Sequence, residues 1–486
     1  MDSRPKSRPL ALWYAAAVAL SAAALFFGSG LKPVWWLMWL APLPVLLLAP
    51  RARTLTAFSA ASLAWTAGGL NMWTYERQLG MPLWLVLFLL IIPAVAAGFA
   101  VLLFRAFLRR GNLWLAVVSW PCVWVAYEFI MSLTGTYGDV AYTQMRFLPV
   151  VQIAALAGVW GAGFLVLLFS STVAALVSGE SGRQKPALAA AMAAVFILAL
   201  GYGGWRLRST PSAPHSLLVG LAASGLPQNI FPGAPGQAMR LFSESAGEVR
   251  GLAGRGAQVV ILPEMIARVP DTISDEIDHL FEAAAGETRT LVLVGVLHIK
   301  NGYALNEGRL YSPAGMLDAV YIKHHLVPGA EAGERPGSAL TLLHGPAGVI
   351  GIEICKDMDY PPLARQYGKR EVGLLLVPAW DFGRDGLWHA RMAFMRGVEN
   401  GFTIARVAKN GLLTISDDRG RILAGQNSAA APFATLLARA PVRHEATLYT
   451  RWGDWFAWLN VGALALILFV LACSFKTQAK KPWGEE

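Results

Sequence analysis

Long apolar runs recur along the first 206 residues of this 486-residue chain, and they constrain its fold more than any other feature. A helix needs roughly 20 apolar residues to cross a bilayer core about 30 Å thick. Seven runs near that length lie in this region, and an eighth, Phe456–Cys473, follows close to the C-terminus. The seven are Leu10–Gly28, Val34–Leu48, Leu55–Trp73, Pro82–Phe104, Leu113–Ser132, Val150–Val177 and Ala187–Trp205. With 55% hydrophobic and only 15% charged residues, the chain is predicted to be a multi-pass α-helical membrane protein.

The basic residues are distributed unevenly among the loops between these runs, and this asymmetry predicts the orientation. If the N-terminus is cytoplasmic, loops on that side carry thirteen basic residues and the short loops opposite carry three. The thirteen are Arg4, Lys6, Arg8, Arg51, Arg53, Arg105, Arg109, Arg110, Arg183, Lys185, Lys476, Lys480 and Lys481, and the three are Lys32, Arg77 and Arg146. We therefore expect both termini in the cytoplasm. The same asymmetry explains much of the net charge of +10, so the charge does not indicate a nucleic-acid partner.

Residues 207–454 differ in character, because glycine, proline and charged residues become frequent and apolar runs shorten to strand length. This segment is predicted to be a water-soluble α/β domain outside the cytoplasm. The predicted organisation is a seven-helix membrane domain at 1–206, an extracytoplasmic domain at 207–454, an eighth membrane helix at 455–474 and a cytoplasmic tail at 475–486. The expected strands are Leu217–Ala222, Val259–Leu262, Leu291–Val296, Ala304–Tyr311, Leu317–Ile322, Val349–Ile354 and Gly373–Val377, with a helix at Gln237–Ala253.

Three polar residues follow predicted strands of this domain: Glu264, Lys323 and Cys355. The chain has two further cysteines, Cys122 and Cys473, and both fall inside membrane runs. A carboxylate could remove the proton of the thiol, and a lysine with the backbone N–H after the cysteine could stabilise an oxyanion. These three groups together can form an acyl-transfer site. Each one alone has an ordinary structural interpretation, as a small core thiol, a solvated loop carboxylate and a surface ammonium.

The eight histidines show no spacing typical of a metal site, and no glycine-rich phosphate loop is present. We therefore expect neither a metal nor a cofactor.

Four ordered motifs resemble the nitrilase, or carbon–nitrogen hydrolase, superfamily. They are Leu262-Pro263-Glu264, the run Tyr321–Gly329 that contains Lys323, the run Gly351–Cys355, and Trp388–Gly401 followed by Ala408-Lys409-Asn410-Gly411. The resemblance implies an αββα sandwich with a Glu-Lys-Cys triad.

The membrane part extends the resemblance to the apolipoprotein N-acyltransferase family, in which seven helices precede the nitrilase domain and one follows. The matching residues are Trp120-Pro121 through Trp124 and Glu128, then Gly138–Gln144, Gln152-Ile153-Ala154 and Gly158–Leu165. Membership would imply a bacterial inner-membrane enzyme with membrane lipid around it. Its acyl donor would be a phospholipid, and its acceptor the free amine of a diacylglyceryl-cysteine apolipoprotein.

The resemblance assigns roles to single residues. Glu264 would be the general base, Lys323 the oxyanion-stabilising cation and Cys355 the nucleophile. Glu331 matches an additional glutamate of the family, which would hold the lysine and the base in register.

Four further residues are expected to contact substrate: Lys356, Asp357, Trp380 and Glu128. Lys356 and Asp357 stand after the nucleophile where the family usually has an aromatic residue and a glutamate. Trp380-Asp381 is closer to soluble nitrilases. Glu128 places a carboxylate near the outer end of a membrane run, which is costly unless it reaches water or a partner.

Three functions stay open at the level of sequence. The first is the lipoprotein acyltransferase. The second is a membrane-tethered amidase or nitrilase that uses the same triad on a small amide, which Lys356 and Trp380-Asp381 favour. The third is a non-enzymatic membrane protein with a binding domain, which would have no need of a thiol between a base and a cation.

Overall fold

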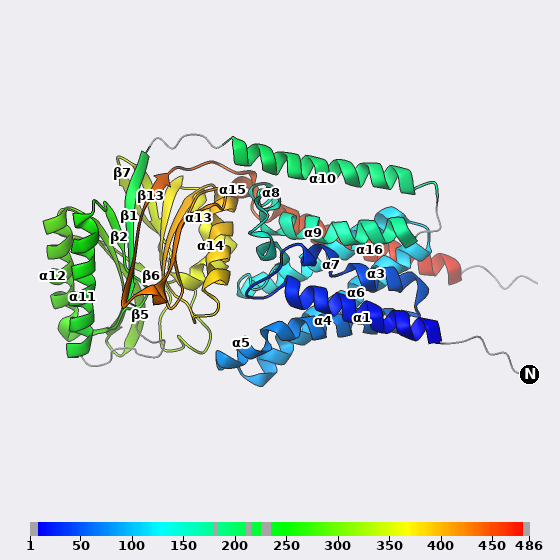
Figure 1. Ribbon diagram of the computed structural model, residues 1–486, viewed down its shortest axis with the longest axis horizontal. Coiled ribbons are helices and arrows are strands. Elements are labelled where there is room, and N and C mark those ends of the chain that lie inside the picture. The colour runs from blue at the N-terminus through cyan, green and yellow to red at the C-terminus, as the bar shows by residue number, and fades with distance from the viewer. Residues whose placement is uncertain (1–7, 179–181, 210–214, 225–234, 480–486) are drawn as a thin grey trace, which may run out of the picture. The chain divides into compact units, whose positions relative to one another are not determined.

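The computed structural model describes residues 8–178, 182–209, 215–224 and 235–479 (Figure 1). Arg4, Lys6, Lys480 and Lys481, which entered the orientation argument, lie outside these ranges. The chain divides into two compact units, one of residues 1–205 with 454–486 and the other of residues 206–453.

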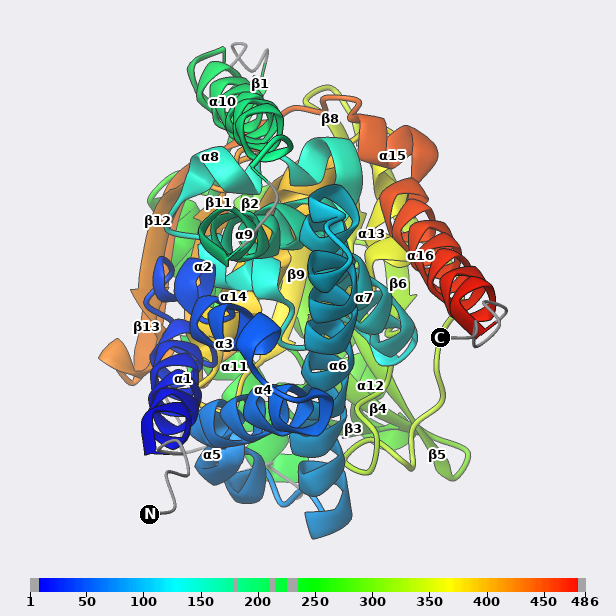
Figure 2. The same ribbon diagram turned by 90° about the vertical axis from the view of Figure 1, so that its right-hand side faces the viewer.

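Six helices in the described part of the chain are long and apolar enough to cross a membrane. Helix α7 packs against α6, α9 and α16, and α4 packs between α1 and α6 (Figure 2). The six helices are α1 (Arg8–Gly28), α6 (Leu83–Arg109), α7 (Leu113–Met131), α9 (Ala154–Ser178), α10 (Lys185–Arg208) and α16 (Trp455–Ala479). The prediction of a multi-pass membrane protein is thereby supported, with six span-length helices in place of the eight apolar runs.

The second and third apolar runs form shorter helices than expected. Val34–Leu48 contains α2 (Leu37–Leu40) and α3 (Leu43–Leu48), which are separated at Pro42. Proline has no N–H to donate and its ring crowds the preceding turn, so it interrupts a helix. The third run forms α4 (Thr54–Gly69), which ends at two glycines of low helix propensity and continues into a 3₁₀ turn and α5 (Trp73–Gln78). A further short helix of this unit is α8 (Leu148–Val151).

The second unit contains two β-sheets. The seven-stranded sheet has the order β13-β1-β2-β4-β5-β6, with β3 paired to β4, and the six-stranded sheet has the order β12-β11-β10-β9-β8-β7. The first sheet contains β1 (His215–Ser224), β2 (Val259–Ile261), β3 (Arg268–Pro270), β4 (Leu291–Lys300), β5 (Tyr303–Tyr311), β6 (Leu317–Ile322) and β13 (Phe433–Val442). The second contains β7 (Thr341–Gly345), β8 (Gly348–Ile352), β9 (Val372–Trp380), β10 (Thr403–Lys409), β11 (Leu412–Ser416) and β12 (Ile422–Asn427).

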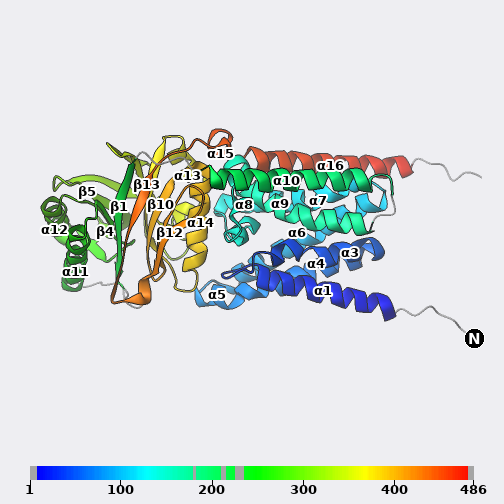
Figure 3. The same cartoon turned by 45° about the horizontal axis from the view of Figure 1, so that its top comes forward.

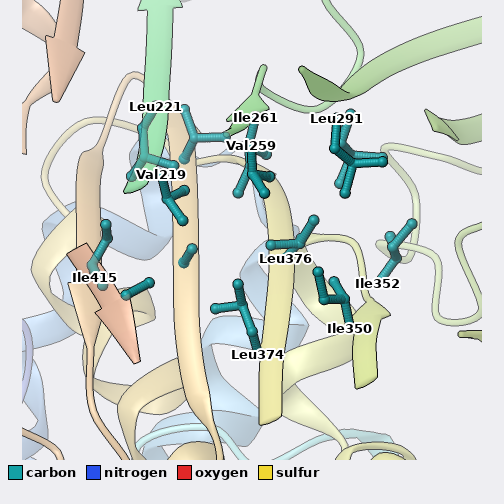
Figure 4. Close-up of a cluster of buried hydrophobic side chains, with 14 of the residues drawn as sticks. Val219, Leu221, Val259, Ile261, Leu291, Ile350, Ile352, Leu374, Leu376 and Ile415 are labelled. Carbon is teal, nitrogen blue, oxygen red and sulfur yellow. The ribbon is translucent and has the colours of Figure 1, made fainter. Parts of the chain in front are cut away.

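Alternating apolar side chains of both sheets meet in one buried core between them. Leu221 and Ile261 from the first sheet and Leu374 and Leu376 from the second lie in this core (Figure 4). Because side chains alternate along a strand, the residues between them face outward and are free to pack on helices. Val260 and Val292, for example, belong to a different core on the outer face of the first sheet.

Helices cover the outer faces of both sheets (Figure 3). On the first sheet lie α11 (Pro235–Gly254) and α12 (Asp271–Thr288), and on the second lie α13 (Pro361–Gly368) and α14 (Gly386–Asn400). A short helix α15 (Leu448–Trp452) ends the unit. The four layers are helix, sheet, sheet and helix, which confirms the predicted αββα sandwich.

Candidate active site

The predicted triad residues follow strands that run in the same direction within each sheet. Strand β2 is parallel to β4, and β6 is parallel to β4 because both are antiparallel to β5. In the other sheet β8, β9 and β10 are mutually parallel. Residues just past the carboxyl ends of parallel strands share one edge of a sheet, where α/β proteins usually place their chemistry. Glu264, Lys323 and Cys355 all occupy such positions.

Lys323 is held between two carboxylates. Its Nζ donates to Glu264 Oε1 at 2.7 Å, and to Glu331 Oε1 and Oε2 at 2.7 and 3.0 Å. All three side chains are almost fully buried. An ammonium donates three hydrogen bonds and carboxylates only accept them, so the arrangement satisfies the lysine in a place that water does not reach.

A fourth residue, Asn306 of β5, completes this cluster. Its Nδ2 donates to Glu264 Oε1 at 2.7 Å and to Glu331 Oε1 at 3.2 Å. Glu331 in turn accepts from the backbone N–H of Val327 at 2.6 Å, which ties the loop after β6 to the cluster. Asn306 was not among the residues predicted from the sequence. The available signal was a polar side chain inside a predicted strand.

The electrostatics keep Lys323 charged. Burial by itself would lower the pKa of Lys323, but the negative charges of Glu264 and Glu331 outweigh it and raise this pKa well above its usual value. For Glu331, burial is the larger influence and raises its pKa, against the opposing charge of Lys323. The cluster therefore holds a permanent cation next to the thiol.

Cys355 begins a short 3₁₀ turn, Cys355–Asp359, three residues after the end of β8. Its φ is +47°, in the left-handed region that non-glycine residues avoid, and such strain of order 1–3 kcal/mol is often found at functional positions. The thiol lies 3.6 Å from the Trp380 carbonyl oxygen, to which it donates. Burial first, and then the charge of Glu264, raise the pKa of Cys355 well above its usual value, although Lys323 and Arg406 oppose this. Cys355 therefore rests as a thiol, and it would need a base to act as a nucleophile.

Asp357 was predicted to contact substrate, and the structure places it among buried hydrogen bonds. It is completely buried, and its oxygens accept from Tyr321 Oη at 2.7 Å and from the backbone N–H and Nδ1 of His325 at 2.8 and 3.0 Å. It also accepts from the backbone N–H of Ile354. Asp357 thus fastens the loop after Lys323 to the turn that carries Cys355, and we assign it a positioning role in place of substrate contact.

Lys356 and Trp380, which were predicted to contact substrate, lie beside Cys355, the first in sequence and the second in space. Lys356 Nζ is 3.2 Å from Asp359 Oδ2, and its side chain is 18% exposed. Burial would lower the pKa of Lys356, but the charge of Asp359 raises it overall. Trp380 presents its carbonyl oxygen to the thiol.

Asp381, the residue after Trp380, is an internal ion-pair partner. It is fully buried, and both of its oxygens accept from the guanidinium of Arg406 on β10, one of them at 2.9 Å. Asp381 therefore supports the end of β9.

Glu128 belongs to the helical unit, where it lies on α7 and is 4% exposed. Its Oε1 accepts from Trp124 Nε1 at 2.9 Å and from the backbone N–H of Val140 at 2.8 Å. Within the described residues, its Oε2 has no hydrogen-bond partner. A carboxylate half satisfied in this way inside a membrane helix is a candidate for a functional contact.

In the described part of the chain, no group of three or more His, Cys, Asp or Glu residues could hold a metal ion.

A fold of two helix-covered sheets, with a thiol, a cation and carboxylates at the strand ends, defines the class of carbon–nitrogen hydrolases, and the profile of that class matches residues 221–451. The profile of the apolipoprotein N-acyltransferase N-terminal domain matches residues 15–172. The chain belongs to the apolipoprotein N-acyltransferase family, which confirms the resemblance drawn from the motifs.

Individual relatives agree with this over nearly the whole chain. An apolipoprotein N-acyltransferase of Geobacter metallireducens is 29% identical, with 91% of this chain and 92% of the relative covered. One of Nitrosomonas europaea is 25% identical, with 93% and 96% covered. Among solved structures, an amidase from Nesterenkonia sp. is 18% identical with a TM-score of 0.41, and the match covers 52% of this chain and 99% of the amidase.

Proposed function

We propose that this protein transfers a fatty acyl chain from a phospholipid, through a thioester on Cys355, to the N-terminal amine of a diacylglyceryl-cysteine apolipoprotein. The observation that carries the proposal is the ammonium of Lys323, held by Glu264 and Glu331 and acting electrostatically on Cys355. The family membership indicates an acyltransferase, and this cluster supplies the groups that the chemistry requires.

The first half-reaction forms the thioester. Glu264 takes the thiol proton while the sulfur attacks the ester carbonyl of the phospholipid, and an S–C bond forms. The ester C–O bond then breaks, and the proton passes from Glu264 to the departing oxygen, which leaves as the hydroxyl of a lysophospholipid. Lys323 stabilises the negative charge on the carbonyl oxygen in between.

The second half-reaction uses the same groups in the opposite direction. The apolipoprotein amine attacks the thioester carbonyl, Glu264 accepts the amine proton, and an N–C bond forms. The S–C bond breaks and the proton returns to the sulfur, so Cys355 is again a neutral thiol. Its raised pKa suits this step, because a thiol buried beside Glu264 regains a proton readily.

The membrane setting supplies both substrates. We propose that the catalytic unit lies outside the cytoplasm, at the inner membrane of a bacterium, with both chain ends inside. Both substrates carry acyl chains, so the membrane helices would let them approach without crossing water. Glu128, with one unpartnered carboxylate oxygen among the described residues, is our candidate for a polar contact to a substrate headgroup or amine in that region.

The amidase alternative loses part of its support in the structure. The residues that favoured it were Lys356 and the pair Trp380-Asp381. Asp381 is fully buried against Arg406, and Lys356 is paired with Asp359. Neither feature selects a small amide.

A labelling experiment tests the proposal. The purified protein is incubated with alkyne-tagged phosphatidylethanolamine, and we expect one acyl label that hydroxylamine releases and that maps to Cys355. Cys355→Ala should remove the label, whereas the matched substitution Cys473→Ala should leave it, since Cys473 is an exposed thiol in α16. A wild-type protein without label, or a label that survives Cys355→Ala, would contradict the proposal. Ammonia release from simple amides by the same sample would favour the amidase.

A further inference from the structure

A second lysine lies at the same edge of the sheets as the triad. Lys409 is the last residue of β10, and the parallel register places it next to Trp380, the last residue of β9. It is 9% exposed. Lysine is rarely buried without a specific partner, so the contacts of Lys409 indicate a structural or functional role.

One contact of Lys409 reaches the turn that carries the general base. Its Nζ donates to the backbone oxygen of Met265 at 3.0 Å, although the two residues are 144 positions apart in sequence. Met265 directly follows Glu264 and has a φ of +45°, which is strained for a residue with a side chain. A hydrogen bond to its carbonyl therefore helps to fix a turn conformation that the backbone would not choose by itself.

Another contact of Lys409 reaches Trp380, the residue that accepts the hydrogen bond of the thiol. Lys409 Nζ lies 3.4 Å from the centroid of the Trp380 ring. A cation over an aromatic face contributes about 0.5–2 kcal/mol, and the larger values apply when water is excluded. The Trp380 carbonyl is the acceptor for Cys355. The Lys409 ammonium thus contacts both the turn that carries Glu264 and the ring of Trp380, whose carbonyl oxygen accepts the hydrogen bond of Cys355.

We propose that Lys409, in its ammonium form, is a positioning residue that holds Glu264 and Cys355 in register for acyl transfer. This inference rests on the proposed function because it takes acyl transfer as the reaction. Its geometric part concerns only Glu264, Cys355 and the turn at Met265. The ammonium charge is essential, because a neutral amine would keep the hydrogen bond to Met265 and lose the attraction to the Trp380 ring.

The charge of Lys409 changes near neutral pH. Burial lowers the pKa of Lys409 to about 7, although the negative charge of Glu264 opposes this. The other charged groups around Cys355 are Lys323 with its partner Glu331, Lys356 with its partner Asp359, and Arg406 with its partner Asp381. Lys409 is the cation of this group that loses its charge as the pH rises through about 7.

The test compares Lys409→Met and Lys409→Arg with Lys369→Met, which makes the same chemical change at an exposed lysine after α13. Thioester formation with phospholipid is measured in single turnover from about pH 6 to about pH 8. A displaced catalytic group costs on the order of tenfold to a hundredfold. Lys409→Met should therefore be about tenfold slower or more at about pH 6, and this deficit should shrink as the wild type loses its own charge. The ratio of Lys409→Arg to wild type should rise with pH, because arginine stays charged. Lys369→Met should match wild type throughout.

A second readout does not depend on the phospholipid. Alkylation of Cys355 by iodoacetamide, followed by mass spectrometry of its peptide, should show the same pH-dependent difference between wild type and Lys409→Met. If the proposed function fails, wild type forms no thioester, yet the alkylation result still decides the role of Lys409. A Lys409→Met deficit that is constant with pH would show a merely structural role and overturn the inference. Wild-type rates in Lys409→Met would overturn it as well.

Discussion

At the scale of single residues, the site pairs a permanent cation with a thiol that resists ionisation. Lys323 keeps its charge because two carboxylates surround it, and Cys355 keeps its proton because it is buried beside one of them. In the proposed reaction, Glu264 therefore generates the thiolate during attack. Cys355 does not lose its proton unaided in the resting site, so the proposed reaction needs a separate base.

Glu264→Gln should separate proton transfer from thiol reactivity. Glutamine still accepts from Lys323 but cannot take a proton, so thioester formation should fall by roughly 10²–10⁴. The negative charge of Glu264 contributes to the raised pKa of Cys355, and its removal should lower that pKa. At alkaline pH, where hydroxide can remove the thiol proton in place of Glu264, iodoacetamide alkylation of Cys355 should then be as fast as in wild type or faster. A parallel loss of alkylation would mean that the substitution disrupts the site.

Glu334, three residues after Glu331, should make stability depend on pH. Burial, followed by the charge of Glu331, raises the pKa of Glu334 from 4.5 to about 8. Between these values the folded chain keeps a proton that the unfolded chain has released, so stability falls as the pH rises through this window. Glu334→Gln should raise the thermal unfolding midpoint at about pH 8 and change it little at about pH 4. Glu276→Gln, at an exposed carboxylate of α12, is the control, and an equal effect of both substitutions would contradict the assignment.

The order of the triad residues could be predicted from the sequence, because each follows an apolar strand and the motifs are contiguous. Asn306 and Lys409 could not be assigned their contacts in this way. Asn306 reaches the cluster only because β5 lies between β4 and β6, and Lys409 reaches Met265 across 144 residues. Asp357 was predicted to contact substrate. Its burial and its hydrogen bonds from Tyr321, His324, His325 and Ile354 depend on the folded conformation of the loops, which the neighbouring sequence does not reveal.

At the scale of elements, the turn after β2 depends on close packing against β4. Gly295 of β4 accepts from the backbone N–H of Ile266 at 2.9 Å. A Cβ atom at Gly295 would lie 2.2 Å from the backbone oxygen of Pro263 and 2.7 Å from Glu264 Cα. Both contacts involve backbone atoms, which cannot rotate away. The position of the base is therefore coupled to a glycine in the neighbouring strand.

Gly295→Ala should displace this turn. Overpacking typically costs about 1–3 kcal/mol, and we expect thioester formation to fall more than stability does because Glu264 moves with the turn. Gly247→Ala is the matched control, since nothing lies within 4 Å of a Cβ there and the residue is inside helix α11. This control should be stabilised by about 0.5–1 kcal/mol. Denaturant unfolding and single-turnover labelling measure both effects, and an active Gly295→Ala protein would contradict the packing argument.

The strands predicted from apolar alternation lie where the structure has them, whereas β3, β7, β10, β11, β12 and β13 were not predicted. The expected Leu317–Ile322 is β6 as observed, and Val259–Leu262 differs from β2 by one residue. The membrane helices were predicted less accurately than the strands, because hydrophobicity alone does not indicate where a helix ends. Val34–Leu48 is apolar throughout, yet its helix is interrupted at Pro42. The interruption follows from the missing backbone N–H of proline, which a hydrophobicity pattern does not record.

At the scale of the whole molecule, the proposed orientation can be tested directly. Lys369→Cys places a thiol on the exposed surface of the catalytic unit, and Arg183→Cys places one in a loop that we assign to the cytoplasm. In spheroplasts, a membrane-impermeant maleimide should label the first variant above the wild-type background and the second only after lysis. The opposite pattern would reverse the orientation, since the basic residues of the short loops are the basis of the assignment.

The central claim is that Cys355 carries the acyl chain between the two substrates. The most direct measurement is intact-protein mass spectrometry in a single-turnover chase. After incubation with phospholipid the protein should gain the mass of one acyl chain, located on Cys355. Addition of a diacylglyceryl-cysteine peptide with a free amine should remove that mass and transfer it to the peptide, whereas an N-acetylated peptide should leave it in place. A protein that acylates the peptide without ever carrying the chain, or a chain that stays on Cys355 when the free amine is added, would contradict the account.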